Sequence, residues 1–239
     1  MKKSILILLT FCVLQACETA EQSTSVEHFG ILREIMMQQK LEANANLMDL
    51  NGKSNTYALG ALEGLSGEIL ILDGKPLNGL AKQGQLKINR SFDYKATLLV
   101  MTQVKDWHKV SLEGMIENNS DLQALVAREA EKRGINTDEA FPFLLKGDFE
   151  EIEWHVINAA EATAQNHDAY KAAGLKGKGG YSGASILGFY SNQHEGVFTH
   201  HGSYLHMHFV NDEETEMGHV DNLKNDRKVE LWLAKTVSK

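Results

Sequence analysis

Cysteine and proline are scarce in this sequence, with two of each among 239 residues. Cys12 lies in an apolar N-terminal segment and Cys17 follows that segment, so the chain beyond residue 17 has no thiol. Disulfides and thiolate metal sites are therefore excluded from the body of the chain, where any metal ion must be bound by nitrogen and oxygen ligands. Because the prolines stand singly at Pro76 and Pro142, long proline-rich linkers are excluded as well.

The sequence also has no excess of positive charge. It has 24 Lys and Arg residues against 32 Asp and Glu residues, a formal net charge of -8 at pH 7. An acidic chain of this kind argues against nucleic acid as a partner and against a polybasic membrane-binding patch. The apolar fraction of 43% is typical of globular proteins, and the length is sufficient for one large or two small domains.

Residues 1–16 have the features of a signal peptide. A pair of lysines precedes the mostly apolar residues 4–14, which are too few to span a bilayer, since a spanning helix needs about 20 residues. The next four residues, LQAC, resemble the lipobox of bacterial lipoproteins, with Cys17 as the acylated residue and residues 17–25 as a polar tether. This pattern predicts an exported protein that is lipid-anchored to the cell envelope. The alternative is an ordinary cleaved signal peptide in which the cysteine is incidental.

The rest of the chain predicts an α+β protein with two domains built on mixed β-sheets and a few flanking helices. We expect an N-terminal α/β domain at 26–138 and a β-rich metal-binding domain at 139–239. Helices are predicted from Val26, after a capping box at 24–27, and at 121–133. Apolar runs and alternating patterns predict strands at 56–62, 68–72, 96–104, 152–156, 184–190, 203–210, 218–222 and 228–233.

Residues 176–183 are rich in glycine. A phosphate-binding loop is excluded there, because no clear apolar strand precedes the glycines and no Gly-Lys-Ser/Thr ending follows them. The composition instead predicts a mobile loop.

Three histidines have the spacing of metal ligands. His206 and His208 alternate with apolar residues, so a strand would place both imidazoles on one face, roughly 6–7 Å apart. A polar turn at 211–215 would return the chain antiparallel and bring His219 beside them. Three neutral imidazoles leave open positions on an ion, which is the pattern of catalytic rather than structural zinc.

Other interpretations of these histidines remain open. A His-x-His pair on a strand is more often a coincidence than a ligand pair, although a third histidine on the next strand favours a metal site. His200 and His201 are an alternative source of a ligand, which their predicted loop placement disfavours.

Four blocks of sequence resemble the alpha-acetolactate decarboxylase family. The blocks SILGFY at 185–190, YLHMHF at 204–209 and MGHVD at 217–221 have the order and gaps of that family, and LSGEILILDG at 65–74 is a further match. The resemblance implies that His206, His208 and His219 hold zinc or another divalent metal ion at the junction of two domains. It also implies that Glu68 is the counterpart of a family glutamate that reaches the metal site.

The sequence departs from the family pattern at three places. His155 stands where the family has an arginine that is thought to steer the substrate carboxylate, and Ala61 stands where it has a threonine. A second glutamate, which the family supplies from a tail beyond its last strand, has no clear counterpart up to Lys239. The sequence therefore keeps the metal ligands of the family pattern, while the residues expected to contact the substrate differ from it.

The resemblance implies a carboxy-lyase that converts 2-acetolactate (2-hydroxy-2-methyl-3-oxobutanoate), or a related 2-hydroxy-3-oxo acid, to acetoin and carbon dioxide. Glu68 is the candidate for returning a proton to carbon or orienting the ligands, and His155 is the candidate for the substrate carboxylate. The expected partners are this small-molecule substrate, a membrane through the lipid anchor, and in one interpretation a second copy of the chain in a homodimer.

Two alternatives belong to other classes. One is a non-catalytic, membrane-tethered protein that binds metal or a small ligand. The other is a cupin, because His206, His208 and Glu213 partly fit that family's first motif, although its second motif is not recognisable. A cupin site would use Glu213 as a ligand and leave His219 away from the metal.

Overall fold

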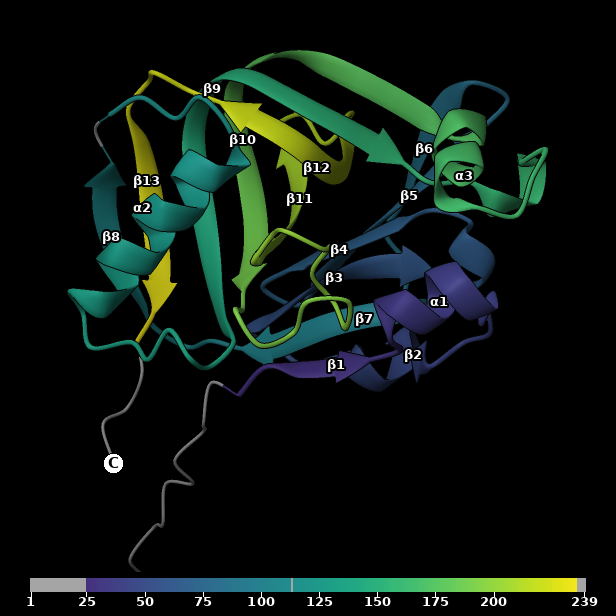
Figure 1. Ribbon diagram of the computed structural model, residues 1–239, viewed down its shortest axis with the longest axis horizontal. Helices are drawn as coiled ribbons and strands as arrows, with labels where there is room; N and C mark the ends of the chain where they lie inside the picture. Colours follow the sequence, from purple (N-terminus) through teal and green to yellow (C-terminus); the bar gives the residue numbers. More distant parts are fainter. Residues whose placement is uncertain (1–24, 113, 236–239) are drawn as a thin grey trace, which may run out of the picture.

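Two antiparallel sheets form the frame of the computed structural model, which describes residues 25–112 and 114–235 (Figure 1). The first sheet has the strand order β1-β7-β3-β4-β5-β6, and β2 pairs with β7 outside this path. Its strands are β1 (Glu27–Phe29), β2 (Ala45–Asn46), β3 (Thr56–Leu62), β4 (Glu68–Leu72), β5 (Lys75–Lys82), β6 (Gln85–Asn89) and β7 (Lys95–Gln103).

The second sheet has the order β10-β11-β12-β9-β13-β8, and β9 also pairs with β10. Its strands are β8 (Trp107–Leu112), β9 (Phe141–Val156), β10 (Leu175–Tyr190), β11 (Leu205–Asn211), β12 (Met217–Lys224) and β13 (Val229–Ala234). Among the described residues the helices are α1 (Leu32–Gln38), α2 (Asn119–Glu131) and α3 (His167–Ala173), with 3-10 turns at Leu47–Leu50, Glu63–Leu65 and Ala159–Glu161. Figure 1 shows α2 beside the second sheet and α1 and α3 at the opposite end of the molecule.

The predicted α+β class is confirmed. The expectation that the sheets are mixed, with parallel as well as antiparallel strand pairs, is wrong. Every pair of named strands that the structure describes is antiparallel. The reason is that tight turns join neighbouring strands. Asp73 and Gly74, both at positive φ, connect β4 to β5, and Gln83 and Gly84 do the same between β5 and β6. Two-residue turns of this kind can join only antiparallel neighbours.

The pairing of the second sheet closes on itself. The long strand β9 pairs with β10 and with β12, and β11 joins β10 to β12. The closure encloses a core of large apolar side chains that includes Phe149, Trp154 and Phe209. It also places β11, β12 and β9 side by side, with His208 opposite His219 and His219 opposite His155.

The glycine-rich segment 176–183 is not a loop, which corrects the expectation from composition. It belongs to β10 and pairs with β9, with irregularities in register between Gly179 and Ala184. At Gly177 the absence of a side chain permits this pairing, because the partner strand carries a large ring there. A Cβ atom on Gly177 would lie 2.3 Å from ring atoms of Trp154, so a side chain there would displace the indole.

The predicted helix from Val26 is also wrong at its start. Residues Glu27–Phe29 form an edge strand that pairs with β7, and the helix α1 begins only at Leu32. Hydrogen bonds with the apolar strand β7 satisfy the backbone N–H and C=O groups of these residues, so no helix is needed to do so. The second predicted helix is confirmed as α2, whose N-cap is Asn118.

Several expectations for the N-terminus lie outside the described residues. These are the signal peptide at 1–16, the lipidated Cys17 and all of the tether except Ser25. Within the part that is described, no helix combines the length and apolar composition needed to cross a bilayer. The division into domains at 26–138 and 139–239 stays a prediction.

Candidate metal centre

Three histidines on two adjacent strands converge on one point. His206 and His208 project from β11, and His219 lies opposite His208 on β12. One ring nitrogen from each of the three lies within 4.8 Å of the others, and the ring centroids are 5.1 to 5.3 Å apart. The alternation along β11 and the antiparallel return through β12 therefore bring together the three residues that the sequence pattern predicts.

The nitrogens of two of these rings are free to bind an ion. His208 Nδ1 donates a hydrogen bond to the backbone oxygen of Ile69 at 2.9 Å, which leaves His208 Nε2 with its lone pair. His208 Nε2 and His206 Nδ1 are buried and have no hydrogen-bond partner among the described residues. Buried polar nitrogens without a partner are costly, and a metal ion in the centre of the triad would satisfy them.

Burial keeps the three imidazoles uncharged. It lowers the pKa of His208 to about 3, and the positive charge of His155 would add to this effect. Burial together with the neighbouring histidines holds the pKa values of His206 and His219 well below the ordinary value. Because the neutral imidazole is the form that ligates metals, the triad fits a divalent cation without a competing proton.

Glu68 reaches the triad from the other sheet. Its Oε2 lies 3.6 Å from His208 Nε2, and its Oε1 accepts a hydrogen bond from the backbone N–H of Ile157 at 3.2 Å. Burial raises the pKa of Glu68 from 4.5 to about 8, against the opposing effect of the Ile157 hydrogen bond. The carboxyl group is therefore protonated at neutral pH and can act as a proton donor.

His155 lies beside the triad on β9. Its ring centroid is 4.9 Å from that of His219, and only 3% of the residue is exposed. The alternating pattern around Trp154 predicts a solvent-facing side chain at this position, and the structure corrects this, because the first sheet and α3 cover that face of β9. Burial lowers the pKa of His155, although its hydrogen bond with Asp221 opposes the shift.

Two further histidines border the same pocket. The sequence pattern gave His167 no role in it and offered His200 only as an alternative source of a ligand. His167 comes from α3 and His200 from the loop before β11. Their ring centroids are 5.7 Å apart, and the ring of His200 is 5.5 Å from that of His219. Burial lowers the pKa of His167 to about 4 and also lowers that of His200. Neither belongs to the group whose nitrogens converge.

Two other alternative ligands from the sequence, His201 and Glu213, lie away from the triad. The exposed His201 interacts through Nδ1 with Glu195 Oε1 at 2.9 Å. Glu213 lies in the turn after β11, where its Oε2 accepts a hydrogen bond from Asn211. Since Glu213 is outside the converging group and His219 is inside it, the arrangement is not the one expected of a cupin.

The pocket has one apolar side and one polar side. Residues of the first sheet and of α1 form the apolar side, and Ala61 is among them. Glu68 and the histidines form the polar side, so both sheets contribute to the pocket. The apolar lining residues include Leu32, Ile35, Met36, Leu65, Leu98 and Ile157.

The model of the alpha-acetolactate decarboxylase family matches residues 30–238 of this sequence. The chain belongs to this family. The resemblance seen in the four sequence blocks is thereby confirmed, and the family match covers both sheets except β1, together with the whole pocket. Among curated proteins, none matches the sequence.

Solved structures show the same fold. A Staphylococcus aureus protein, described as of unknown function and similar to alpha-acetolactate decarboxylase, superposes with a TM-score of 0.71 at 20% identity over 90% of this chain and 86% of that chain. The alpha-acetolactate decarboxylase of Bacillus subtilis strain 168 gives a TM-score of 0.68 at 12% identity over 89% and 86%. The protein from Bacillus subtilis subspecies spizizenii gives 0.69 at 12% identity over 89% and 87%.

Proposed function

We propose that this member of the alpha-acetolactate decarboxylase family is a zinc-dependent carboxy-lyase that converts 2-acetolactate, or a close 2-hydroxy-3-oxo acid, to acetoin and carbon dioxide. The observation that carries the proposal is a buried triad of imidazoles beside the carboxyl group of Glu68, whose pKa is raised by burial. Family membership supports decarboxylation at a coarser level, and the Bacillus subtilis proteins of the same fold are named for this reaction.

The metal would be held by His206 Nδ1, His208 Nε2 and one ring nitrogen of His219. A divalent cation in this place would supply Lewis-acid stabilisation of the negative charge that develops on the ketone and hydroxyl oxygens as the carboxylate leaves. Ile69 supports the site by accepting the Nδ1 proton of His208, which fixes the tautomer and the orientation of that ring.

Glu68 would return the proton. When the bond from carbon to the carboxylate breaks, its electron pair passes toward the neighbouring ketone, and the carbon that lost carbon dioxide must later be protonated. Glu68 is protonated at neutral pH and lies on the pocket wall, so it can donate to that carbon and then be reprotonated from solvent. The Ile157 backbone N–H holds one carboxyl oxygen and thereby orients the group.

His155 lines the same pocket and would contact the substrate carboxylate. Since burial lowers its pKa, the ring is uncharged at neutral pH and binds a carboxylate more weakly than a charged group would. We therefore expect either slow turnover of 2-acetolactate at neutral pH or a preference for another 2-hydroxy-3-oxo acid. A His155→Ala variant as active as the unaltered protein would remove this part of the proposal.

The experiment is an acetoin assay on purified, zinc-loaded protein with 2-acetolactate. We expect acetoin to form, to stop when a chelator removes the metal, and to resume when zinc is restored. Retention of zinc without turnover of any 2-hydroxy-3-oxo acid would overturn the enzymatic proposal. That result would instead support a metal-binding or ligand-binding protein, the second candidate, which the presence of His155 and Ala61 in the pocket favours.

We also propose that the protein is exported and anchored through lipid on Cys17. The support is the sequence LQAC after a short apolar segment. Mass spectrometry of the protein from a bacterial membrane fraction would test this, because acylation of Cys17 adds the mass of a diacylglycerol group and a Cys17→Ser variant would lack it. A mature protein that begins at another residue without lipid would contradict the anchor.

A further inference from the structure

Asp221 bridges the pocket histidine His155 to a lysine. Its Oδ2 lies 2.9 Å from His155 Nδ1, and its Oδ1 lies 2.5 Å from Lys171 Nζ. Each carboxylate oxygen therefore has its own partner. Burial alone would raise the pKa of Asp221, but His155 and Lys171 together hold it below the ordinary value.

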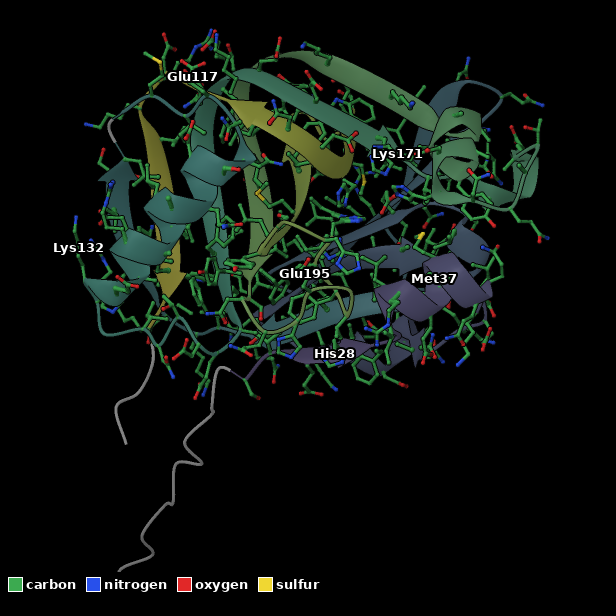
Figure 2. The ribbon with its side chains drawn as sticks, viewed as in Figure 1. His28, Met37, Glu117, Lys132, Lys171 and Glu195 are labelled. Atoms are coloured by element: carbon green, nitrogen blue, oxygen red, sulfur yellow. The ribbon has the colours of Figure 1, made fainter. Side chains whose placement is uncertain are left out.

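Three separate elements supply this chain of contacts. Asp221 follows His219 by two residues on β12 and lies where the register with β9 shifts, between Val220 and Asn222. His155 lies on β9 directly opposite His219. Lys171 comes from α3, and Figure 2 labels it where this helix approaches β12. The strand that provides a candidate metal ligand therefore also provides the carboxylate that holds the neighbouring ring.

The hydrogen bond to Asp221 determines which nitrogen of His155 is available. A neutral imidazole has one N–H and one lone pair, and a carboxylate can only accept. The proton of His155 therefore lies on Nδ1, and Nε2 is the nitrogen that remains for the pocket. The same carboxylate restricts rotation of the ring, because Asp221 is itself held by Lys171.

The pair of charges also affects which ligand the pocket accepts. Asp221 brings a full negative charge into contact with His155, and an anion bound in the pocket would be repelled by it. Lys171 cancels that charge at a distance of 2.5 Å.

We propose that Asp221 and Lys171 are positioning residues of this pocket. Asp221 fixes His155 with Nε2 toward the ligand, and Lys171 cancels the charge of Asp221 so that the pocket admits an anion. The inference rests on the proposed function, because the substrate proposed above is a carboxylate. It adds that this ion pair is what allows an anion to bind in the pocket, and that the amine of Lys171 need not contact the anion.

The test measures binding of 2-hydroxy-2-methylpropanoate, a 2-hydroxy acid anion that has no ketone and cannot be decarboxylated by this route. Calorimetry with the zinc-loaded protein would give its Kd for the unaltered chain, Lys171→Met, Lys171→Arg and the double variant Lys171→Met with Asp221→Asn. Lys178 is the matched control, since it pairs with Glu151 and Glu153 on the surface of the same sheet.

We expect Lys171→Met to raise the Kd by about tenfold and Lys171→Arg to change it by less than about threefold. The double variant should bind nearly as tightly as the unaltered protein, because it removes both charges. Lys178→Met should bind like the unaltered protein. If the double variant binds as weakly as Lys171→Met, Lys171 contacts the anion directly and the proposal is overturned. An unchanged Kd in Lys171→Met, or no binding by the unaltered protein, would also overturn it.

Turnover separates this inference from the proposed function. With 2-acetolactate, Lys171→Met should raise KM with little change in kcat. Asp221→Leu should lower kcat/KM by about tenfold because His155 loses the acceptor that orients its ring, whereas the amide oxygen of Asp221→Asn can still accept from His155 Nδ1. A merely structural role would lower kcat and the Tm together, without a selective rise in KM. If the unaltered protein forms no acetoin but the Kd values follow the expected pattern, the proposed function fails and the role of the ion pair stands.

Discussion

Glu68 and His208 face each other across the contact between the two sheets, with Glu68 Oε2 3.6 Å from His208 Nε2. The next residue of the same strand, Ile69, accepts the Nδ1 proton of His208. One short strand, β4, therefore supplies both a carboxyl group beside the candidate metal ligand and the backbone oxygen that fixes its tautomer. This relationship explains why a site built from histidines of one sheet depends on the packing of the other.

The buried carboxyl group gives the metal-free protein a characteristic pH dependence. The pKa of Glu68 in the folded protein, about 8, is above its ordinary value of 4.5. Its contribution to stability is therefore fully present below pH 4.5 and is lost as the pH rises toward 8. Relative to Glu68→Gln, the unaltered apoprotein should lose free energy of unfolding, on the order of 1 kcal/mol per pH unit within this window.

Urea unfolding of chelator-treated protein at pH 5, 6, 7 and 8 would measure this difference. The pocket histidines titrate in the opposite sense, but they are present in both proteins and their effect largely cancels in the comparison. The exposed Glu63, on the turn before β4, offers a control in Glu63→Gln. Parallel pH profiles for the unaltered protein and Glu68→Gln would show that Glu68 is not held protonated by burial.

The same substitution should separate catalysis from metal binding. Glu68→Gln keeps the shape of the side chain but removes the proton donor. We expect kcat for 2-acetolactate to fall by about 10² to 10⁴, the usual contribution of a general acid, while the zinc content stays the same. Steady-state kinetics and metal analysis on one preparation would check both. A variant with full activity would exclude Glu68 as the donor, and one that loses its zinc would make Glu68 a ligand.

The packing of β10 gives a prediction about stability. A Cβ atom on Gly188 would lie 2.1 Å from the end of the Phe143 ring, which is fully buried. Gly188→Ala should therefore cost about 1–3 kcal/mol, as overpacking of a filled core does. Gly179 lies on the same strand with nothing within 4 Å of its Cβ position, so Gly179→Ala should be neutral or slightly stabilising. Equal losses in thermal unfolding of the two variants would contradict this account.

Much of the site could be predicted because its strands show a regular pattern of apolar and polar residues over a few neighbouring positions. The runs at 56–62 and 68–72 correspond to β3 and β4 residue for residue. The two-residue period of a strand is enough to place His206 and His208 on one face. The polar turn before His219 predicts that the chain returns antiparallel and brings His219 beside them. These features are determined by neighbours in the sequence, so a pattern can reveal them.

The rest depends on contacts between distant segments. His155 alternates with apolar neighbours and looked exposed, but β9 is buried on both faces at Trp154, His155 and Val156, which the pattern of a single strand does not show. The segment 176–183 looked mobile because the indole of Trp154, which leaves no room for a side chain at Gly177, lies on another strand. Asp221 and Lys171 are 50 residues apart and meet only where α3 approaches β12.

The central claim is that His206, His208 and His219 together bind one divalent cation, and zinc analysis tests it most directly. Protein stripped with a chelator and reloaded would be compared with single alanine variants of each ligand and with His201→Ala, an exposed histidine next to the same strand. We expect about one zinc ion per chain in the unaltered protein and in His201→Ala, and loss of tight binding in each of the three ligand variants. Retention of zinc by His206→Ala, His208→Ala and His219→Ala at the level of the unaltered protein would contradict the account.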